Sequence, residues 1–217
     1  MAIVPIKSGK VCHLTAQSGI ETHNLGENKA ALRRTLLAQR MALTPEQRQR
    51  RAQQLTRELW AWLTECVEPN AAIALYWAFR AEIDLQALMD EWRARGGRVY
   101  LPIVQQPKAP LKFAPYRGLA SMQTGAYGIL EPMYEAHELC EQPDDLAVLC
   151  APCVGFNAQG YRLGYGGGFY DRTLANWRAQ GMQLPITVGV ADAWAQIDFL
   201  PNAFDVPFDM LCLADET

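Results

Sequence analysis

The sequence lacks any long apolar run. Its longest stretch of apolar residues, 71 to 79, has nine residues, whereas a helix needs about 20 to cross the hydrocarbon core of a bilayer. The N-terminus also lacks the charged segment, long apolar segment and small-residue cleavage site of a secretory signal. We therefore expect a cytoplasmic protein that does not bind membranes.

Histidines are few, and the cysteines form no metal-binding pattern. The three histidines show no ligand spacing to one another or to a cysteine, which argues against a zinc site. The six cysteines are scattered through a chain that has enough hydrophobic residues to build a core without disulfides. Cys150 and Cys153 have the spacing of a redox pair, but the residues after them indicate a turn instead of the helix that lowers a thiol pKa. We interpret this pair as buried structural thiols.

Net charge is low, at -3 for the 217 residues, which argues against a general nucleic-acid binder. The charges are unevenly placed, because residues 29 to 58 carry eight Lys and Arg against two acidic residues, and residues 131 to 145 carry six acidic residues and no Lys or Arg. Such segments are usually solvated faces, although a basic helix also suits a nucleic-acid or protein partner. The basic segment contains no aromatic residue, so we expect no nucleic-acid partner.

Half of the residues are hydrophobic and a fifth are charged, which is typical of a globular protein. Short apolar stretches alternate with amphipathic helical patterns, and this alternation predicts an α/β fold: a three-layer sandwich with a mixed, mostly parallel sheet and helices on both faces. The expected strands are residues 71–79, 98–104, 111–116, 146–156, 185–191 and 208–214. We expect an irregular N-terminal arm over residues 1–26 and a single monomeric domain over 27–217.

Local signals place several helix ends. A helix is expected to start near Glu27, and Thr44, Pro45 and Gln47 form a capping box with proline at the first helical position, which starts a second helix. Asp84 is a candidate cap for a third helix that ends at the glycine pair 96–97. The buried stripe of the second helix is expected to contain Leu55, Leu59, Trp62, Leu63 and Cys66.

The most informative segment is RLGYGGGFYDR, residues 162 to 172, which contains four glycines and leads into a helical pattern. Glycines allow successive backbone N–H groups to point into one concavity, and the following helix N-terminus adds partial positive charge. Arg162 and Arg172 would add charge, and Asp171 would help to hold Mg²⁺. The segment fits neither the Walker A pattern nor the dinucleotide pattern GxGxxG. A flexible glycine loop with an aromatic anchor is the alternative, but packing does not explain the flanking Arg and Asp.

These residues resemble the signature RLGxGxGYYD of the 5-formyltetrahydrofolate cyclo-ligase family. The resemblance extends from about residue 27 to the C-terminus. It includes Lys29 and Arg33 in the first helix, YWAFRAEIDL with Glu82, YGILEP at 127–132, and FLPNAFDVPFD with Asp205.

The resemblance implies an ATP- and Mg²⁺-dependent conversion of 5-formyltetrahydrofolate to 5,10-methenyltetrahydrofolate. In this reaction the formyl oxygen is phosphorylated, N10 attacks the activated carbon, and phosphate leaves; positioning and charge neutralisation then account for most of the catalysis. By resemblance, Arg162 and Tyr170 are catalytic, Trp77, Glu82 and Tyr170 bind the folate, and Asp171 and Asp205 bind the metal. The ATP-binding residues implied in the same way are Lys29, Arg33, Gly164, Tyr165, Gly166, Gly167, Gly168 and Phe169.

Four residues depart from the family pattern: Asn157, Phe169, Phe204 and Ala214 stand where Asp, Tyr, His and Thr are common. Phe169 keeps the aromatic face of the usual tyrosine but lacks its hydroxyl. These departures leave open a diverged paralogue with weak or altered activity.

Overall fold

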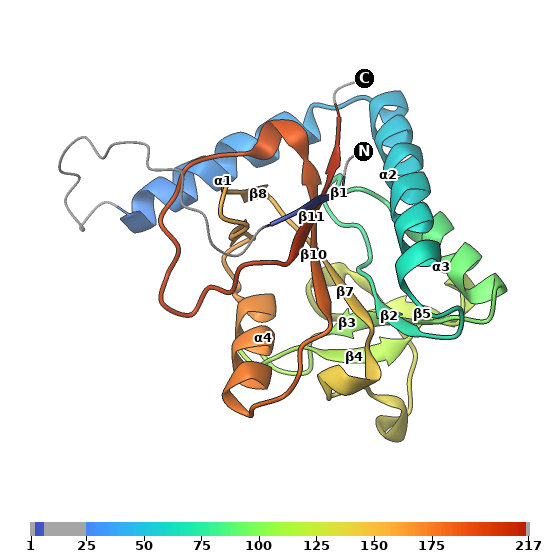
Figure 1. Ribbon diagram of the computed structural model, residues 1–217. Helices are drawn as coiled ribbons and strands as arrows, with labels where there is room; N and C mark the ends of the chain where they lie inside the picture. Colours follow the sequence, from blue (N-terminus) through green and yellow to red (C-terminus); the bar gives the residue numbers. More distant parts are fainter. Residues whose placement is uncertain (1–2, 7–24, 216–217) are drawn as a thin grey trace.

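The computed structural model describes residues 3–6 and 25–215, and a seven-stranded sheet runs through its centre (Figure 1). The strand order is β1-β11-β10-β7-β2-β3-β4. The five central strands pair in parallel, while β1 and β4 lie antiparallel at the two edges. The strands are β1 Ile3–Pro5, β2 Ala72–Ala74, β3 Arg98–Ile103, β4 Lys112–Pro115, β7 Val148–Pro152, β10 Ile186–Asp192 and β11 Met210–Ala214.

The order of the central strands reverses between β2 and β7. From β2 the chain continues outward to β3 and β4, whereas from β7 it continues in the opposite direction to β10 and β11. In open α/β sheets, ligands bind in the crevice outside the carboxyl ends of the strands at such a switch point. The topology therefore places a binding crevice where β2 and β7 end.

Four helices cover the two faces of the sheet, with α2 and α3 on one side and α1 and α4 on the other (Figure 1). Alternate residues of the strands point to opposite faces, so β2 contributes Ile73 to the core beneath α2 and α3, and Ala72 and Ala74 to the opposite core. The predicted three-layer α/β sandwich is confirmed. The helices are α1 Leu25–Met41, α2 Pro45–Cys66, α3 Gln86–Ala94 and α4 Phe169–Ala179.

The capping box of α2 forms as predicted, whereas the N-cap of α3 is Leu85 and Asp84 lies one residue before it. Thr44 and Gln47 form both bonds of the capping box at the start of α2, and Asp84 Oδ1 accepts a hydrogen bond from the Gln86 N–H at the start of α3 (2.8 Å). The predicted stripe of α2 is correct for Leu55, Leu59 and Leu63, which are buried. It is wrong for Cys66, which is exposed because α2 ends there.

Two expectations about the ends of elements need correction. The strand predicted for 71–79 is much shorter, because the backbone leaves the sheet after Ala74 and forms the loop that leads to α3. Most of the arm predicted for 1–26 lies outside the described residues. Inside them, Ile3–Pro5 is a strand that pairs with β11, and the first helix begins at Leu25.

Two small sheets lie next to the central one. One is the hairpin of β5 (Met122–Thr124) and β6 (Leu130–Pro132), and the other pairs β8 (Gly155–Phe156) with β9 (Arg162–Leu163). Within the described part of the chain, none of the helices is long and apolar enough to cross a membrane.

Candidate active site

A cavity of about 490 Å³ lies at the carboxyl ends of β2, β3 and β7, at the switch point between β2 and β7. The loop after β2, the hairpin β5–β6 and the segment from β9 to α4 form its walls. Its lining is mostly apolar and aromatic with a few charged groups, as is typical of small-molecule sites. The residues that line it include Trp77, Phe79, Glu82, Tyr127, Arg162, Tyr165, Gly167, Gly168, Phe169 and Tyr170.

The glycine segment joins β9 directly to the N-terminus of α4. Gly166 (φ 97°) and Gly168 (φ 64°) adopt left-handed conformations, which side chains with a Cβ rarely tolerate. Gly168 is also the N-cap of α4, so the first free N–H groups of this eleven-residue helix are next to the loop. The loop and the helix end together have the backbone geometry that suits an anion, and its binding there stays a prediction.

Arg33 of α1 contacts the glycine loop directly. Its Nε donates a hydrogen bond to the carbonyl oxygen of Gly164 (2.7 Å). Burial and the nearby charge of Arg162 lower the pKa of the Arg33 guanidinium, while Asp205 acts in the opposite direction. Two guanidinium groups close enough to repel each other indicate a place where negative charge is favourable.

Lys29, one turn earlier on α1, is buried and faces a different segment. Its Nζ lies 3.4 Å from Asp205 Oδ2 and 5.4 Å from the centre of the Phe199 ring. By resemblance, both Lys29 and Arg33 belong to the ATP site with the glycine loop. The structure instead pairs Lys29 with the loop before β11, and this pairing brings Asp205 close to the two basic residues.

Both carboxylates that resemblance assigns to the metal are held by basic side chains. Asp171 Oδ2 accepts a hydrogen bond from Arg162 (2.8 Å), and Asp205 Oδ2 accepts one from the Asn202 N–H (2.8 Å) in addition to its pairing with Lys29. Among the described residues, no three acidic, histidine or cysteine side chains form a cluster that could hold a metal by themselves. Mg²⁺ in nucleotide sites often takes only one or two protein carboxylates together with phosphate oxygens, and these carboxylates fit that arrangement.

Arg162 and Tyr170 leave hydrogen-bonding groups free at the cavity. The guanidinium of Arg162 lies 5.2 Å from the centre of the Tyr170 ring. Arg162 Nε and the Tyr170 hydroxyl are both buried without a hydrogen-bond partner in the described part of the chain. Burial raises the pKa of Tyr170, which keeps its hydroxyl protonated. Unsatisfied buried polar groups are costly, so a bound ligand is the natural partner for both.

Glu82 is held by a tight turn in the loop after β2. Its Oε2 accepts a hydrogen bond from the Phe79 N–H (2.9 Å), and its own N–H donates to the Phe79 carbonyl (3.1 Å). The two residues between them, Arg80 and Ala81, both have positive φ, a conformation that costs non-glycine residues of the order of 1 kcal/mol or more each. Burial raises the pKa of Glu82 to about 6, against the opposing effect of Arg40.

The aromatic residues predicted for the two ligands lie together in the cavity. Trp77 lines it and packs against Tyr116. Tyr165 and Phe169 were expected at the ATP site, but their rings contact the cavity aromatics: Tyr165 lies 6.2 Å from Phe79, and Phe169 lies 6.1 Å from Tyr127. These two side chains thus form part of the cavity wall, next to the backbone of the glycine segment.

Sequence reasoning missed two residues of this region. Arg40 was counted only among the basic residues of 29–58, yet it is buried and donates a hydrogen bond to the Tyr165 hydroxyl (2.7 Å). Tyr127 lies within the quoted YGILEP segment but was given no role, and it lines the cavity from the β5–β6 hairpin. No local sequence pattern indicates that Arg40 or Tyr127 lies at the cavity, because both positions depend on contacts between segments distant in the chain.

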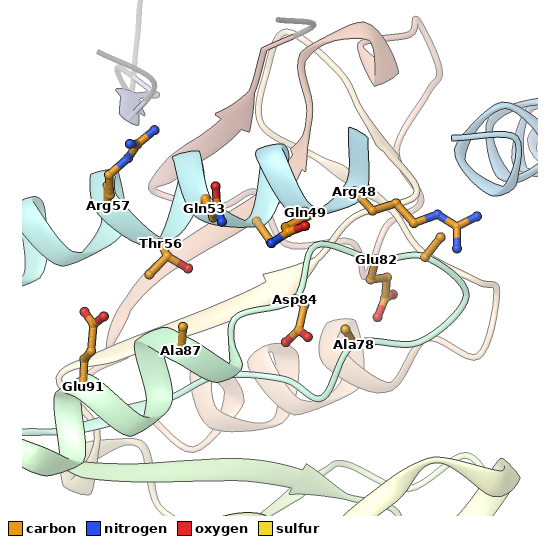
Figure 2. A pocket seen from close by; sticks show the side chains of 12 residues that line it. Arg48, Gln49, Gln53, Thr56, Arg57, Ala78, Glu82, Asp84, Ala87 and Glu91 are labelled. Carbon is orange, nitrogen blue, oxygen red and sulfur yellow. The ribbon is translucent and has the colours of Figure 1, made fainter. Parts of the chain in front are cut away.

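A second groove, of about 750 Å³, lies between α2, α3 and the loop that carries Glu82. Figure 2 shows Gln49, Gln53 and Thr56 on α2 opposite Asp84 and Glu91. Glu82 lines both cavities. This groove contacts neither the glycine loop nor the aromatic cluster, so we place the chemistry in the smaller cavity.

Cys150 and Cys153 are buried and free, as predicted, and burial raises the pKa of each thiol to about 12. Thiolates are the reactive form, so neither cysteine is prepared for redox or nucleophilic chemistry. We expect a Cys150→Ala, Cys153→Ala double variant to keep its turnover number within about a factor of two, at some cost in stability from the lost packing. Steady-state rates and thermal unfolding of the same sample would separate the two effects. A folded variant that has lost turnover would contradict this interpretation.

An α/β fold with a glycine loop at a helix N-terminus, basic side chains around it and a largely apolar cavity beside it is typical of enzymes that act on small molecules. The sequence profile of the 5-formyltetrahydrofolate cyclo-ligase family matches residues 25–214, so the chain belongs to that family.

Individual relatives agree with this assignment. The chain is 36% identical to the 5-formyltetrahydrofolate cyclo-ligase of Escherichia coli over 171 residues, 77% of this chain and 90% of the relative. It is 39% identical to that of Haemophilus influenzae over 142 residues, 64% of this chain and 74% of the relative. The solved 5,10-methenyltetrahydrofolate synthetases of Mycoplasma pneumoniae and Aquifex aeolicus both align with a TM-score of 0.66. They are 26% and 30% identical and cover 85% and 87% of this chain, and 98% and 89% of their own chains. The predicted family and the expectation of an enzyme are confirmed.

The departures from the family pattern lie in different environments. Asn157 is buried and both polar atoms of its amide are hydrogen-bonded: Oδ1 accepts from the N–H groups of Gln159 and Tyr161, and Nδ2 donates to the Phe199 carbonyl (3.2 Å). An aspartate there would lack that donor. Phe204 is 78% exposed and Ala214 is buried in β11. Of the four departures, only Phe169 lines the cavity.

Proposed function

We propose that this protein converts 5-formyltetrahydrofolate to 5,10-methenyltetrahydrofolate with consumption of ATP and Mg²⁺. The observation that carries the proposal is the juxtaposition of the glycine loop with the aromatic cavity at one sheet edge, because Gly167 and Gly168 line the same cavity as Trp77 and Glu82. A nucleotide bound at the loop would present its terminal phosphate to a formyl group bound in the cavity.

The residues around the loop supply the charge neutralisation that phosphoryl transfer needs. Arg33 and Lys29 bind the nucleotide from α1, and Arg162 holds the transferred phosphoryl group. Asp171 and Asp205 would hold Mg²⁺, which neutralises phosphate charge when bound. No nucleophilic side chain takes part, since the formyl oxygen attacks the phosphorus and N10 then attacks the activated carbon.

The cavity residues orient the folate. Trp77, Phe169 and Tyr127 provide apolar faces for flat rings, and Glu82 accepts hydrogen bonds from N–H groups of the pterin. Tyr170, with its protonated hydroxyl free and Arg162 against its ring, donates a hydrogen bond at the reacting formyl group.

The deciding experiment is an absorbance assay for methenyltetrahydrofolate, with 5-formyltetrahydrofolate, ATP and Mg²⁺ supplied together and with each omitted in turn. Product is expected only in the complete mixture, with phosphate released in equal amount. Binding of a non-hydrolysable ATP analogue without product or phosphate would favour the diverged paralogue, for which the change at Phe169 is the relevant observation. Failure to bind either ligand would contradict the proposal.

A further inference from the structure

Arg40 lies near the end of α1 and is only 4% exposed. Its Nη1 donates a hydrogen bond to the carbonyl oxygen of Cys153 (3.1 Å), and its Nη2 donates to the Tyr165 hydroxyl (2.7 Å). Both acceptors are neutral, and Nε makes no hydrogen bond within the part of the chain that the structure describes. Burying a charge against neutral acceptors costs several kcal/mol in principle, so packing alone gives a poor reason for an arginine here.

Tyr165 connects Arg40 to the turn that carries Glu82. Its hydroxyl lies 3.4 Å from the Phe79 carbonyl oxygen, and its ring packs 6.2 Å from the ring of Phe79. The Phe79 N–H in turn donates to Glu82 Oε2 (2.9 Å). A tyrosine hydroxyl has one proton to donate. Since Arg40 donates to its oxygen, that proton is directed toward the turn and its carboxylate.

Charged side chains lie near Glu82 on several sides, including Arg80 of the same turn, which packs over the Phe79 ring and lines the same cavity. Arg40 from α1 is the stronger of two cations that favour its ionised form, and Arg162 from β9 is the weaker. The other titratable groups that interact with it, from the loop after β2, the β7–β8 connection, the glycine segment and α4, are neutral in their ordinary state: Tyr76, Cys153, Tyr165 and Tyr170. On the side of the second groove, Arg48 and Asp84 line the same space. Removing Arg40 therefore removes the main charge that opposes the effect of burial.

We propose that Arg40 is a positioning residue of the folate cavity, which acts through Tyr165 to hold the turn 79–82 and to keep the Glu82 carboxylate ionised and oriented toward the substrate. This inference rests on the proposed function, because it takes Glu82 as the group that binds folate. Arg40 itself does not need to touch the substrate.

Arg40→Met tests the proposal, with Arg34→Met, an exposed arginine of the same helix, as the matched control. We expect the KM for 5-formyltetrahydrofolate to rise by about 10- to 100-fold, as when a hydrogen bond to a charged group is lost, and the KM for ATP to change by less than about twofold. The acid limb of kcat/KM for folate should move to higher pH, because without Arg40 the pKa of Glu82 rises further. Arg40→Lys should restore the position of the acid limb, because lysine keeps the positive charge. It should restore only part of the affinity, because lysine lacks the planar guanidinium that binds two acceptors at once.

A double-mutant cycle then asks whether Arg40 acts through Tyr165. With Tyr165→Phe, the losses in folate affinity should be less than additive, since both changes break one chain of contacts. An additive cycle, or an unchanged KM and acid limb in folded Arg40→Met, would overturn the proposal. If Arg40→Met does not fold, Arg40→Gln takes its place under the same criteria. If wild-type protein forms no product, the proposed function fails separately, and equilibrium titration with 5-formyltetrahydrofolate at several pH values still measures the effect of Arg40.

Discussion

Replacing Glu82 by glutamine should weaken 5-formyltetrahydrofolate binding by about 1.5 to 3 kcal/mol, roughly 10- to 100-fold, the range for a hydrogen bond to a charged group. The side chain keeps its size, so the turn 79–82 is retained, but the amide no longer offers two anionic acceptors to the pterin. Affinity for a non-hydrolysable ATP analogue should stay within about twofold, because Arg33 and the glycine loop are untouched. Separate equilibrium titrations with each ligand measure both effects.

The same substitution isolates a pH effect. Because the pKa of Glu82 is raised to about 6, its carboxylate becomes protonated as the pH falls through that value, and folate binding by the wild-type protein should weaken. Titration without ATP removes the contribution of the nucleotide phosphates. Glu82→Gln has no carboxylate to protonate, so its affinity should be lower and nearly constant between about pH 5 and pH 8, on either side of that pKa. A variant that keeps the wild-type pH dependence would show that another group is responsible.

Arg33→Ala and Lys29→Ala should have the opposite selectivity. Each removes a charge-assisted bond to the nucleotide, and we expect ATP affinity to fall by about 1.5 to 3 kcal/mol per lost bond. Folate affinity should change little. Lys29→Ala should also lower thermal stability more than Arg33→Ala, because it leaves Asp205 without its partner in a part-buried site.

Arg34→Ala is the matched control for both, since Arg34 is an exposed neighbour on the same helix. It should bind both ligands as the wild-type protein does. Equal losses for ATP and folate in the Glu82, Lys29 and Arg33 variants would indicate general misfolding or a wrong assignment of the site, and the residue roles would then have to be withdrawn.

The order of helices and strands follows from short-range pattern. The capping box of Thr44 and Gln47 and the leucine repeat of α2 need only neighbours along the chain to be recognised. The extent of β2 did not follow in the same way. Its apolar run continues past Ala74, but the strand stops there, because the following residues turn away at the switch point to line the cavity.

The sequence by itself determined the fold class, the family and the position of the glycine loop, because alternating apolar segments and a glycine pattern are local properties of the chain. Only the tertiary structure decided how charges pair. Lys29 pairs with Asp205 across 176 residues, Arg33 contacts Gly164 across 131, and Arg40 contacts Tyr165 across 125. Burial and pairing at such separations depend on how α1 packs against the loops at the sheet edge. Composition showed Arg40 only as one basic residue among eight in its segment, and packing turned it into a buried neighbour of the cavity.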